Sequence, residues 1–274
     1  MNASNGGAGV RSKSWLLAAL FVALIVIAAA IVFTIRGGDS DEQHEPEPTV
    51  PATVPGGSND GFGVPVTDVY GRRVDVPAAE AGQPLPQTGS PVTESDPSWL
   101  TASPAGTTGR GGWQRVFGVS VPFSTSDGPA RISDGMAAGY AHSPRGAALA
   151  GVYITHQLAA RPADPAVVAR VNYSRQDMDT YRSKVAAGTL PTHQPEEVTR
   201  WVIAPDAYQV VSWSPDLCVL KIAVRAKPGT PQQAPTWTAV PVSVVWTGGD
   251  WNLLPSSEVN GGQQISSILG WTPW

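Results

Sequence analysis

The side chains that could carry chemistry in this sequence are few, and the first set is four histidines. They are His44, His142, His156 and His193. No two of them, and no His and Cys, stand at the three- or four-residue spacing that places two metal ligands on one face of a helix. The sequence therefore predicts no metal site and no cofactor.

Nucleophilic catalysis has equally little support. Ser120, Ser124 and Ser126 lie outside any Gly-x-Ser-x-Gly turn, and no glycine-rich loop joins a strand to a helix as a phosphate site would require. The single cysteine, Cys218, lies in an apolar run, where a buried small hydrophobic residue is the expected role. We predict that the chain has no catalytic residue and is not an enzyme.

Composition divides the chain into parts with different roles. Between Asp39 and Leu100 there are 10 Pro, 7 Gly and 11 acidic residues against two basic residues, whereas nine of the ten Trp lie at Trp99 or beyond. The core must therefore come from the C-terminal part, and residues 36–98 are predicted to form a disordered acidic linker. From Thr101 to Trp274 the charge is nearly balanced, with 13 basic and 11 acidic residues. A domain without a basic patch is not expected to bind nucleic acid.

The run from Trp15 to Ile35 is apolar and uncharged. At about 1.5 Å per residue, a helix of this run spans roughly 30 Å, the thickness of the bilayer core. An uncleaved anchor is favoured over a cleaved signal peptide, because the one candidate cleavage site, Ala28 to Ala30, lies inside the apolar run. Arg11 and Lys13 predict that residues 1–14 are cytoplasmic and that the C-terminal domain lies outside the cell membrane. The sequence thus predicts a single-pass membrane protein.

One stretch of the predicted linker differs from the rest. Residues Phe62 to Val76 contain β-branched side chains on both sides of Gly71, which indicates a short strand or hairpin. Two interpretations stay open. The hairpin either docks on the domain or on a partner, or it is an unpaired stretch of linker, since an isolated two-stranded hairpin is marginal in water.

Residues 99–274 are predicted to form one α+β domain. A strand or extended segment is expected at 113–123, followed by three helices at about 144–160, 166–173 and 174–188. Runs rich in Val, Ile, Trp and Tyr then predict strands at 198–204, 207–213, 217–226, 237–247 and 250–254. Helices followed by consecutive strands predict helices packed on one face of a curved antiparallel sheet. The terminal Trp271 and Trp274 are either clamped onto this sheet or offered to a partner, and clamping is favoured because exposed tryptophans invite aggregation.

This order of an anchor, a helical stretch and four or five antiparallel strands resembles a known group of domains. They are the nuclear-transport-factor-like (cystatin-like) extracytoplasmic domains of the bitopic assembly proteins of type IV secretion and conjugation machines. The likeness covers roughly Trp113 to Leu254, and the Ala/Val/Pro/Trp-rich style also resembles actinobacterial anchored proteins encoded with conjugative elements. The resemblance implies a scaffold that self-associates and recruits other subunits, although the same fold also serves enzymes and binding modules.

The fold implied by the resemblance can hold a base and an acid inside the cone of its sheet. The nearest candidates by position are Tyr153, His156, Asp177, Asp179 and Tyr181. The two aspartates open a helix, where charges ordinarily face solvent, and His156 is expected to be a half-buried helix residue. No site is therefore assigned to them.

Two functional hypotheses follow from the sequence. The first is a membrane-anchored extracytoplasmic scaffold or assembly component of a conjugation or secretion complex, attached through Trp15 to Ile35, with protein partners and self-association. The second is a tethered ligand-binding or hydrolytic module that acts at the cell wall or outside the cell. A polar cavity lined by His156 and an Asp would favour the second hypothesis, and a cone filled by Trp and Leu would exclude it.

Overall fold

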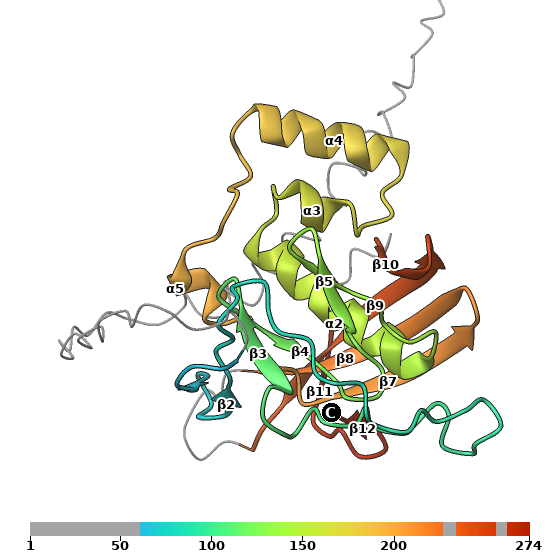
Figure 1. Ribbon diagram of the computed structural model, residues 1–274. Coiled ribbons are helices and arrows are strands. Elements are labelled where there is room, and N and C mark those ends of the chain that lie inside the picture. Colours follow the sequence, from blue (N-terminus) through green and yellow to red (C-terminus); the bar gives the residue numbers. More distant parts are fainter. Residues whose placement is uncertain (1–60, 227–233, 256–261) are drawn as a thin grey trace, which may run out of the picture.

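The computed structural model of the protein describes residues 61–226, 234–255 and 262–274. Its largest sheet has the strands β7 (Ala207–Ser214), β8 (Leu217–Arg225), β9 (Trp237–Thr247), β10 (Asp250–Leu254), β11 (Gln263–Ile265) and β12 (Thr272–Pro273). The strand order is β10-β9-β8-β7-β12, and β11 pairs with the other end of β9. All these pairings are antiparallel, and a long helix, α2 (Pro144–Ala160), crosses one face of the sheet (Figure 1).

Three small hairpins precede the large sheet in the chain. They pair β1 (Val66–Thr67) with β2 (Arg73–Val74), β3 (Trp113–Val116) with β4 (Val119–Pro122), and β5 (Arg131–Ser133) with β6 (Met136–Ala138). Three shorter helices follow α2, namely α3 (Pro165–Val168), α4 (Arg175–Ala186) and α5 (Glu196–Thr199). Figure 1 shows α4 as the outermost helix, with α3 between it and α2.

Helix α2 forms where the sequence predicts it and is buried on nearly all sides. Ser143 is its N-cap, because the serine hydroxyl accepts a hydrogen bond from the Gly146 N–H, and Pro144 occupies the first turn. A helix that is apolar around its whole circumference must lie inside the protein. The large sheet packs against one side of α2 and β4 against another. The helix therefore fills the space that an open cone would have left as a pocket.

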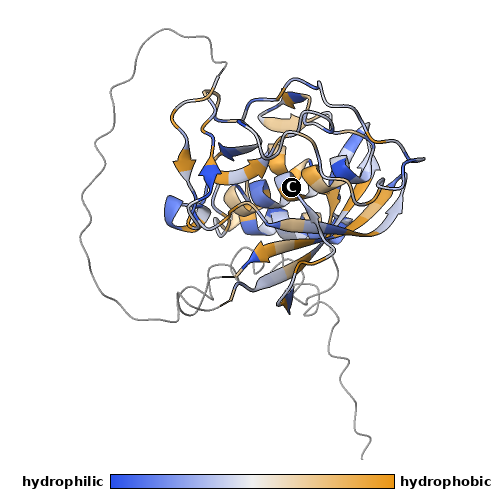
Figure 2. Ribbon diagram, turned by 90° about the horizontal axis from the view of Figure 1, so that it is seen from below, coloured by the Kyte–Doolittle hydropathy of each residue, from blue (hydrophilic) through white to orange (hydrophobic). Residues whose placement is uncertain are grey.

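Alternation along the strands decides which side chains meet α2. Cys218, Leu220 and Ile222 of β8 are buried toward the helix, together with Val242 and Val244 of β9. The residues between them face the other side of the sheet, as the period of two requires. Hydrophobic residues accordingly gather along the strands of the sheet and along the helix beside them (Figure 2). The prediction that Cys218 is a buried hydrophobic residue is confirmed.

Several elements differ from those predicted. The expected strand at 113–123 is the hairpin β3–β4, because Phe117 and Gly118 adopt positive φ angles of 47° and 83° and turn the chain back. The expected helix at 166–173 stops at Val168, since the next residues run beside β10, where the Asn172 N–H donates to Leu253 O. The expected strand at 198–204 does not form, because residues 198–199 end α5 and the chain from there to β7 has no regular secondary structure. The helix at 175–186 and the strands β7 to β10 are confirmed.

The predicted fold class is wrong in its balance. The structure is mostly sheet with a few helices, because the expected strand at 113–123 is two strands, β5 and β6 form where no element is expected, and two of the expected helical or extended segments are short turns of helix. No helix in the described ranges combines the length and the apolar character needed to cross a membrane. This finding contradicts the prediction of a single-pass membrane protein with a cytoplasmic N-terminus and an external C-terminal domain. The expected tail at 1–14 and the expected span from Trp15 to Ile35 lie outside the described residues.

The described part of the predicted linker is folded onto the domain, so the prediction of disorder is wrong for residues 61–98. The β1–β2 hairpin is held by Arg72, whose guanidinium donates to Asp206 Oδ1 at 2.7 Å and to Ala204 O at 2.6 Å. Farther along, the Gln83 N–H donates to the Gln114 side chain at 2.7 Å. These long-range contacts hold residues 61–98 on the domain. An acidic, proline-rich composition gives no indication of such contacts. Residues 36–60 lie outside the described residues.

We expect the substitution Arg72→Ala to loosen the β1–β2 hairpin from the domain, while the backbone hydrogen bonds between Asp75 and β3 remain. Arg72 is the residue that ties the hairpin to Asp206, whereas Arg73 bonds only to Asp75 in its own hairpin segment. Hydrogen exchange of the backbone amides at 61–77 should therefore accelerate in Arg72→Ala and stay close to the wild-type rate in Arg73→Ala. Equal acceleration in both variants would contradict the assignment.

The C-terminus is clamped onto the sheet, as favoured from the sequence. β12 pairs with Ala207 and Tyr208 at the start of β7. Trp274 is only 8% exposed, and its ring lies 5.7 Å from that of Trp113 and 4.6 Å from that of Tyr208, measured between centroids. The terminal tryptophan thus closes one end of the core.

Candidate functional site

The structure separates the five residues that the sequence suggested as an acid and base set. Tyr153 is buried in α2, and its hydroxyl oxygen accepts a hydrogen bond from the Ala137 N–H at 3.1 Å. His156 is one helical turn farther on and is also buried, where its Nδ1 lies 2.7 Å from Ser120 O. Because a carbonyl oxygen accepts, Nδ1 must carry the proton. Both side chains therefore belong to the core and face backbone groups.

The other three candidates lie on α4, away from His156. Ser174 caps this helix by accepting from the Asp177 N–H, the Asp177 carboxylate accepts from the Ser174 hydroxyl at 2.6 Å, and Asp179 is exposed beside Arg182. Tyr181 packs against the α3 segment, with its hydroxyl donating to Ala163 O. The prediction that the aspartates face solvent is confirmed for Asp179, whose side chain is 66% exposed. No acid and base pair is assembled from this set.

Burial of His156 predicts a pH dependence of stability. Loss of hydration lowers the pKa of His156 from its ordinary value of 6.5 to about 4, with the Ser120 hydrogen bond opposing part of the change. Below pH 6.5 the unfolded chain binds a proton that the folded chain does not, so stability falls from about pH 6.5 toward pH 4. We expect His156→Gln to flatten the dependence of the free energy of unfolding on pH in this window, measured by urea denaturation. Parallel curves for the two proteins would contradict the prediction.

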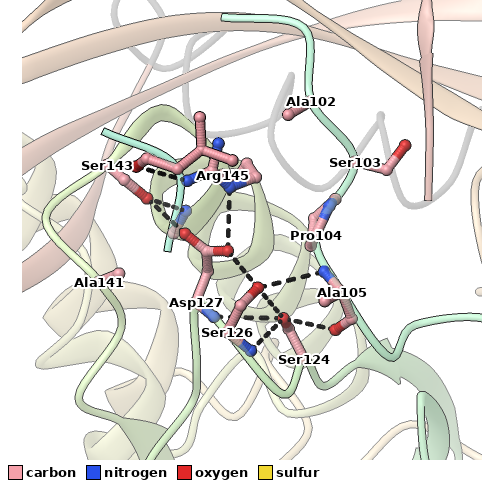
Figure 3. Close-up of polar contacts among 12 residues, drawn as sticks. Ala102, Ser103, Pro104, Ala105, Ser124, Ser126, Asp127, Ala141, Ser143 and Arg145 are labelled. Carbon is pink, nitrogen blue, oxygen red and sulfur yellow. Dashed lines mark hydrogen bonds and ion pairs between the residues drawn. The ribbon is translucent and has the colours of Figure 1, made fainter. Parts of the chain in front are cut away.

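A buried polar cluster joins the end of β4 to the start of α2. We call Ser124, Ser126, Asp127, Ser143 and Arg145 the α2 start network (Figure 3). The Asp127 carboxylate accepts from three side chains: the Ser126 hydroxyl at 2.6 Å, the Ser143 hydroxyl at 2.8 Å and Arg145 Nε at 2.9 Å. The Asp127 and Arg145 side chains are 1% and 2% exposed, so the ion pair is fully buried.

The side chains of the α2 start network bond to one another and to the backbone, which is a structural role. The Ser124 hydroxyl donates to Ala105 O, and its oxygen accepts from the N–H groups of Ser126 and Asp127. A catalytic serine needs a base that takes its proton, and the hydrogen-bond partners of these hydroxyls include no histidine. Asp127 is instead neutralised by Arg145. The cluster fixes the chain entry into α2 and the segment 102–105 that passes beside it.

One part of the α2 start network connects to aromatic residues. Arg145 Nη2 donates to Val92 O at 3.1 Å, and the guanidinium carbon lies 5.6 Å from the centre of the Trp99 ring. Arg145 Nη1 is buried and has no hydrogen-bond partner among the described residues. The Trp99 ring beside the guanidinium provides a favourable cation–π contact. Trp99 in turn meets Trp213 edge to face, with ring centroids 5.8 Å apart. The network thus also holds residues 92–99 against the sheet.

No pattern in the sequence predicts the α2 start network. Ser124 and Ser126 match no nucleophile motif, and neither Asp127 nor Arg145 belongs to a motif. The available signal was the Ser143-Pro144 start of a helix followed at once by an arginine, since a cation in the first turn of a helix is unfavourable unless an anion offsets it. No group of three or more His, Cys, Asp or Glu able to hold a metal ion occurs in the described ranges.

A surface cleft of about 480 Å³ lies between the β5–β6 hairpin, α3 and the turn that joins β9 to β10. On its wall the Arg170 guanidinium donates to the Asn252 side chain and to two backbone carbonyls, and it lies 3.4 Å from the Asp250 carboxylate. Asp250 also accepts from three backbone N–H groups. These groups are engaged by the fold, which leaves the exposed Arg131 and Asp134 as the charged side chains available to a ligand.

The large sheet has one covered edge and one open edge. Beside β10, the Leu253 N–H donates to Arg170 O and Leu253 O accepts from Asn172. Beside β7, the strand β12 pairs only with Ala207 and Tyr208. Within the ranges that the structure describes, no backbone hydrogen bond reaches the outer side of β7 beyond Tyr208. Residues 209–214, which we call the open edge, therefore present unpaired backbone groups to the solvent.

The side chains of the open edge include none of the kinds that prevent pairing with another strand. Gln209, Val211, Ser212 and Ser214 are exposed, and no residue of β7 is charged. Val211 is 53% exposed and lies at a bulge, where the register with β8 shifts between Val210 and Ser212. Natural edge strands usually carry lysine, proline or inward-pointing charges that prevent pairing with another chain. Apart from the bulge, this edge has none of these devices.

Comparison with known families places most of this geometry within one family domain. A family model described as a domain of unknown function, DUF8175, matches residues 75–273. The chain belongs to the DUF8175 family. No curated protein and no solved structure matches it. The DUF8175 match contains the α2 start network, the cleft and the open edge, whereas most of the β1–β2 hairpin precedes it.

Proposed function

We propose that this DUF8175 protein is a non-catalytic assembly component that binds another protein chain through the open edge of its large sheet. The observation that carries the proposal is the stretch 209–214, which is uncharged, mostly exposed and without a backbone partner on its outer side among the described residues. An extended peptide gains main-chain hydrogen bonds when it adds to such an edge, and side chains alternate between the two faces to give specificity.

The hydrogen bonds of the polar side chains support a non-catalytic role. His156 and Tyr153 are occupied by backbone partners, and the hydroxyls of the α2 start network are engaged in the fold. The alternative of a hydrolytic or ligand-binding module needed a cavity in the cone of the sheet. Helix α2 occupies that side, and the fully buried Trp251 and Leu149 fill the space around it. These observations favour an interaction component.

The expected place in a conjugation or secretion complex is part of the same proposal. What supports it is the order of a buried helix followed by the consecutive antiparallel strands β7 to β10, which is the part of the resemblance to assembly proteins of those machines that lies within the described residues. A scaffold in such a complex requires surfaces that bind neighbouring subunits and no reactive residue. The open edge is such a surface.

A photo-crosslinking residue placed at position 211 in the full-length chain tests the proposal in producing cells. We expect irradiation to join the chain covalently to another polypeptide at Val211, because a strand added to β7 lies within reach of this side chain. The matched control is position 185 on α4, where Val185 is 40% exposed, because α4 lies on the opposite side of the domain from β7 (Figure 1). No product at 211, or equal products at 211 and 185, would contradict the proposal.

A further inference from the structure

We infer that the strand added at the open edge is β7 of a second copy of this chain, paired antiparallel about a two-fold axis. This inference rests on the proposed function and names the partner of the same surface. A contact of this kind places the same patch on both copies, so the patch has to be complementary to itself. The charges, the exposed apolar side chains and the polar side chains of the open edge decide whether it is.

The charge distribution suits pairing of two identical strands. Like charges directly opposite one another destabilise paired strands. Residues 207–214 carry no charged side chain, so two antiparallel copies avoid this repulsion. The charge that precedes the strand, Asp206, is already held by Arg72 and Arg225, each at 2.7 Å. An edge adapted to a charged peptide would be expected to carry the opposite charge, and this edge carries none.

Exposed apolar side chains gather at the same place. Val211 is 53% exposed in the middle of the open edge, and Leu217, at the start of the neighbouring strand, is 38% exposed. Leu217 is the register partner of Ser214, so it borders the far end of the open edge. Antiparallel pairing centred on the open edge brings the two copies of Val211 together near the axis. Burial of these side chains adds a hydrophobic contribution to the main-chain hydrogen bonds.

The polar side chains of the edge are also compatible with self-pairing. Gln209, Ser212 and Ser214 carry amide or hydroxyl groups that both donate and accept hydrogen bonds. When a strand pairs with itself in the antiparallel sense, residues near one end face residues near the other. Gln209 of one copy therefore comes close to the serine end of the other copy, where either side chain can donate.

Sedimentation velocity of the purified full-length chain over a range of concentrations tests the inference. We expect a reversible dimer for the wild-type chain. In Val211→Lys two like charges meet near the axis, and the dissociation constant of the dimer should rise by at least about tenfold. Val185→Lys, which adds the same charge at an exposed valine of α4, should leave the constant unchanged. Circular dichroism and thermal unfolding establish that each variant remains folded.

A cysteine pair provides a second measurement that does not depend on weakening the dimer. Mild oxidation of Val211→Cys should produce a disulfide-linked dimer, and Val185→Cys should not. The native Cys218 does not interfere, because it is fully buried and its burial raises the pKa of the thiol to about 12.

The outcomes separate this inference from the proposed function. A wild-type chain that is monomeric at every concentration, or a dimer that Val211→Lys leaves unchanged, would overturn pairing between copies. If photo-crosslinking at position 211 then yields a different protein, binding at the open edge stands and only self-pairing fails. If it yields no product, both fail.

Discussion

Replacing Asp127 with alanine is expected to lower the free energy of unfolding by about 3–5 kcal/mol. The substitution leaves the Arg145 guanidinium, 2% exposed, without its counter-charge in the interior. It also removes the acceptor of the Ser126 and Ser143 hydroxyls at the first turn of α2. Urea denaturation followed by tryptophan fluorescence measures the change, because the unfolding transition shifts to lower urea concentration.

Two further variants decide whether the buried charge is the cause. The double variant Asp127→Ala with Arg145→Met should recover part of the lost stability, since removal of both charges leaves no unpaired ion in the core. Asp179→Ala, which removes the exposed partner of Arg182, should leave the transition where it is. If Asp127→Ala proves no more harmful than Asp179→Ala, the α2 start network does not support the fold as described.

Substitution of Gly146 by alanine is expected to destabilise the protein by about 1–3 kcal/mol, although alanine is the better helix former. A Cβ atom at Gly146 would lie 2.0 Å from Ala141 O, a backbone atom that cannot turn aside. The same carbonyl accepts hydrogen bonds from the Ser143 N–H and from Trp251 Nε1, each at 2.9 Å. Moving it would therefore disturb both the cap of α2 and the largest buried side chain.

A matched glycine in the same helix gives the comparison. At Gly151 the nearest atom to an added Cβ is the Val242 side chain at 3.0 Å, which can shift by rotation more readily than a carbonyl can. We expect Gly151→Ala to cost less than Gly146→Ala when both are measured by thermal unfolding. An increase in the melting temperature of Gly146→Ala would show that helix propensity outweighs the contact with Ala141.

Prediction from sequence succeeded where local signals are strong. The Ser143-Pro144 cap and the apolar run behind it located α2, and the Gly248-Gly249 turn located the β9–β10 hairpin. It failed where a long-range contact competes with a local preference. Residues 170–172 run along β10 in place of a longer helix, and residues 61–98 dock on the domain through contacts such as that of Arg72 with Asp206. Composition alone carries no information about such partners.

The candidate sites show the same division. The absence of a catalytic motif could be stated from residue types, and the burial of Cys218 could be read from its apolar neighbours. The α2 start network could not, because Asp127 and Arg145 are eighteen residues apart in the chain and meet only when β4 and α2 come together. The open edge could not either, because every residue of β7 is ordinary for a strand and its exposure depends on where β12 ends.

By itself, the sequence determined the caps, turns and alternating faces of the elements, since these depend on residues within a few positions of one another. The tertiary structure alone decided which strand became the free edge of the sheet, which carboxylate neutralised Arg145, and that α2 filled the concave side. Those outcomes depend on groups brought together from distant parts of the chain, where the loss of hydration makes each pairing far more consequential than it is at the surface.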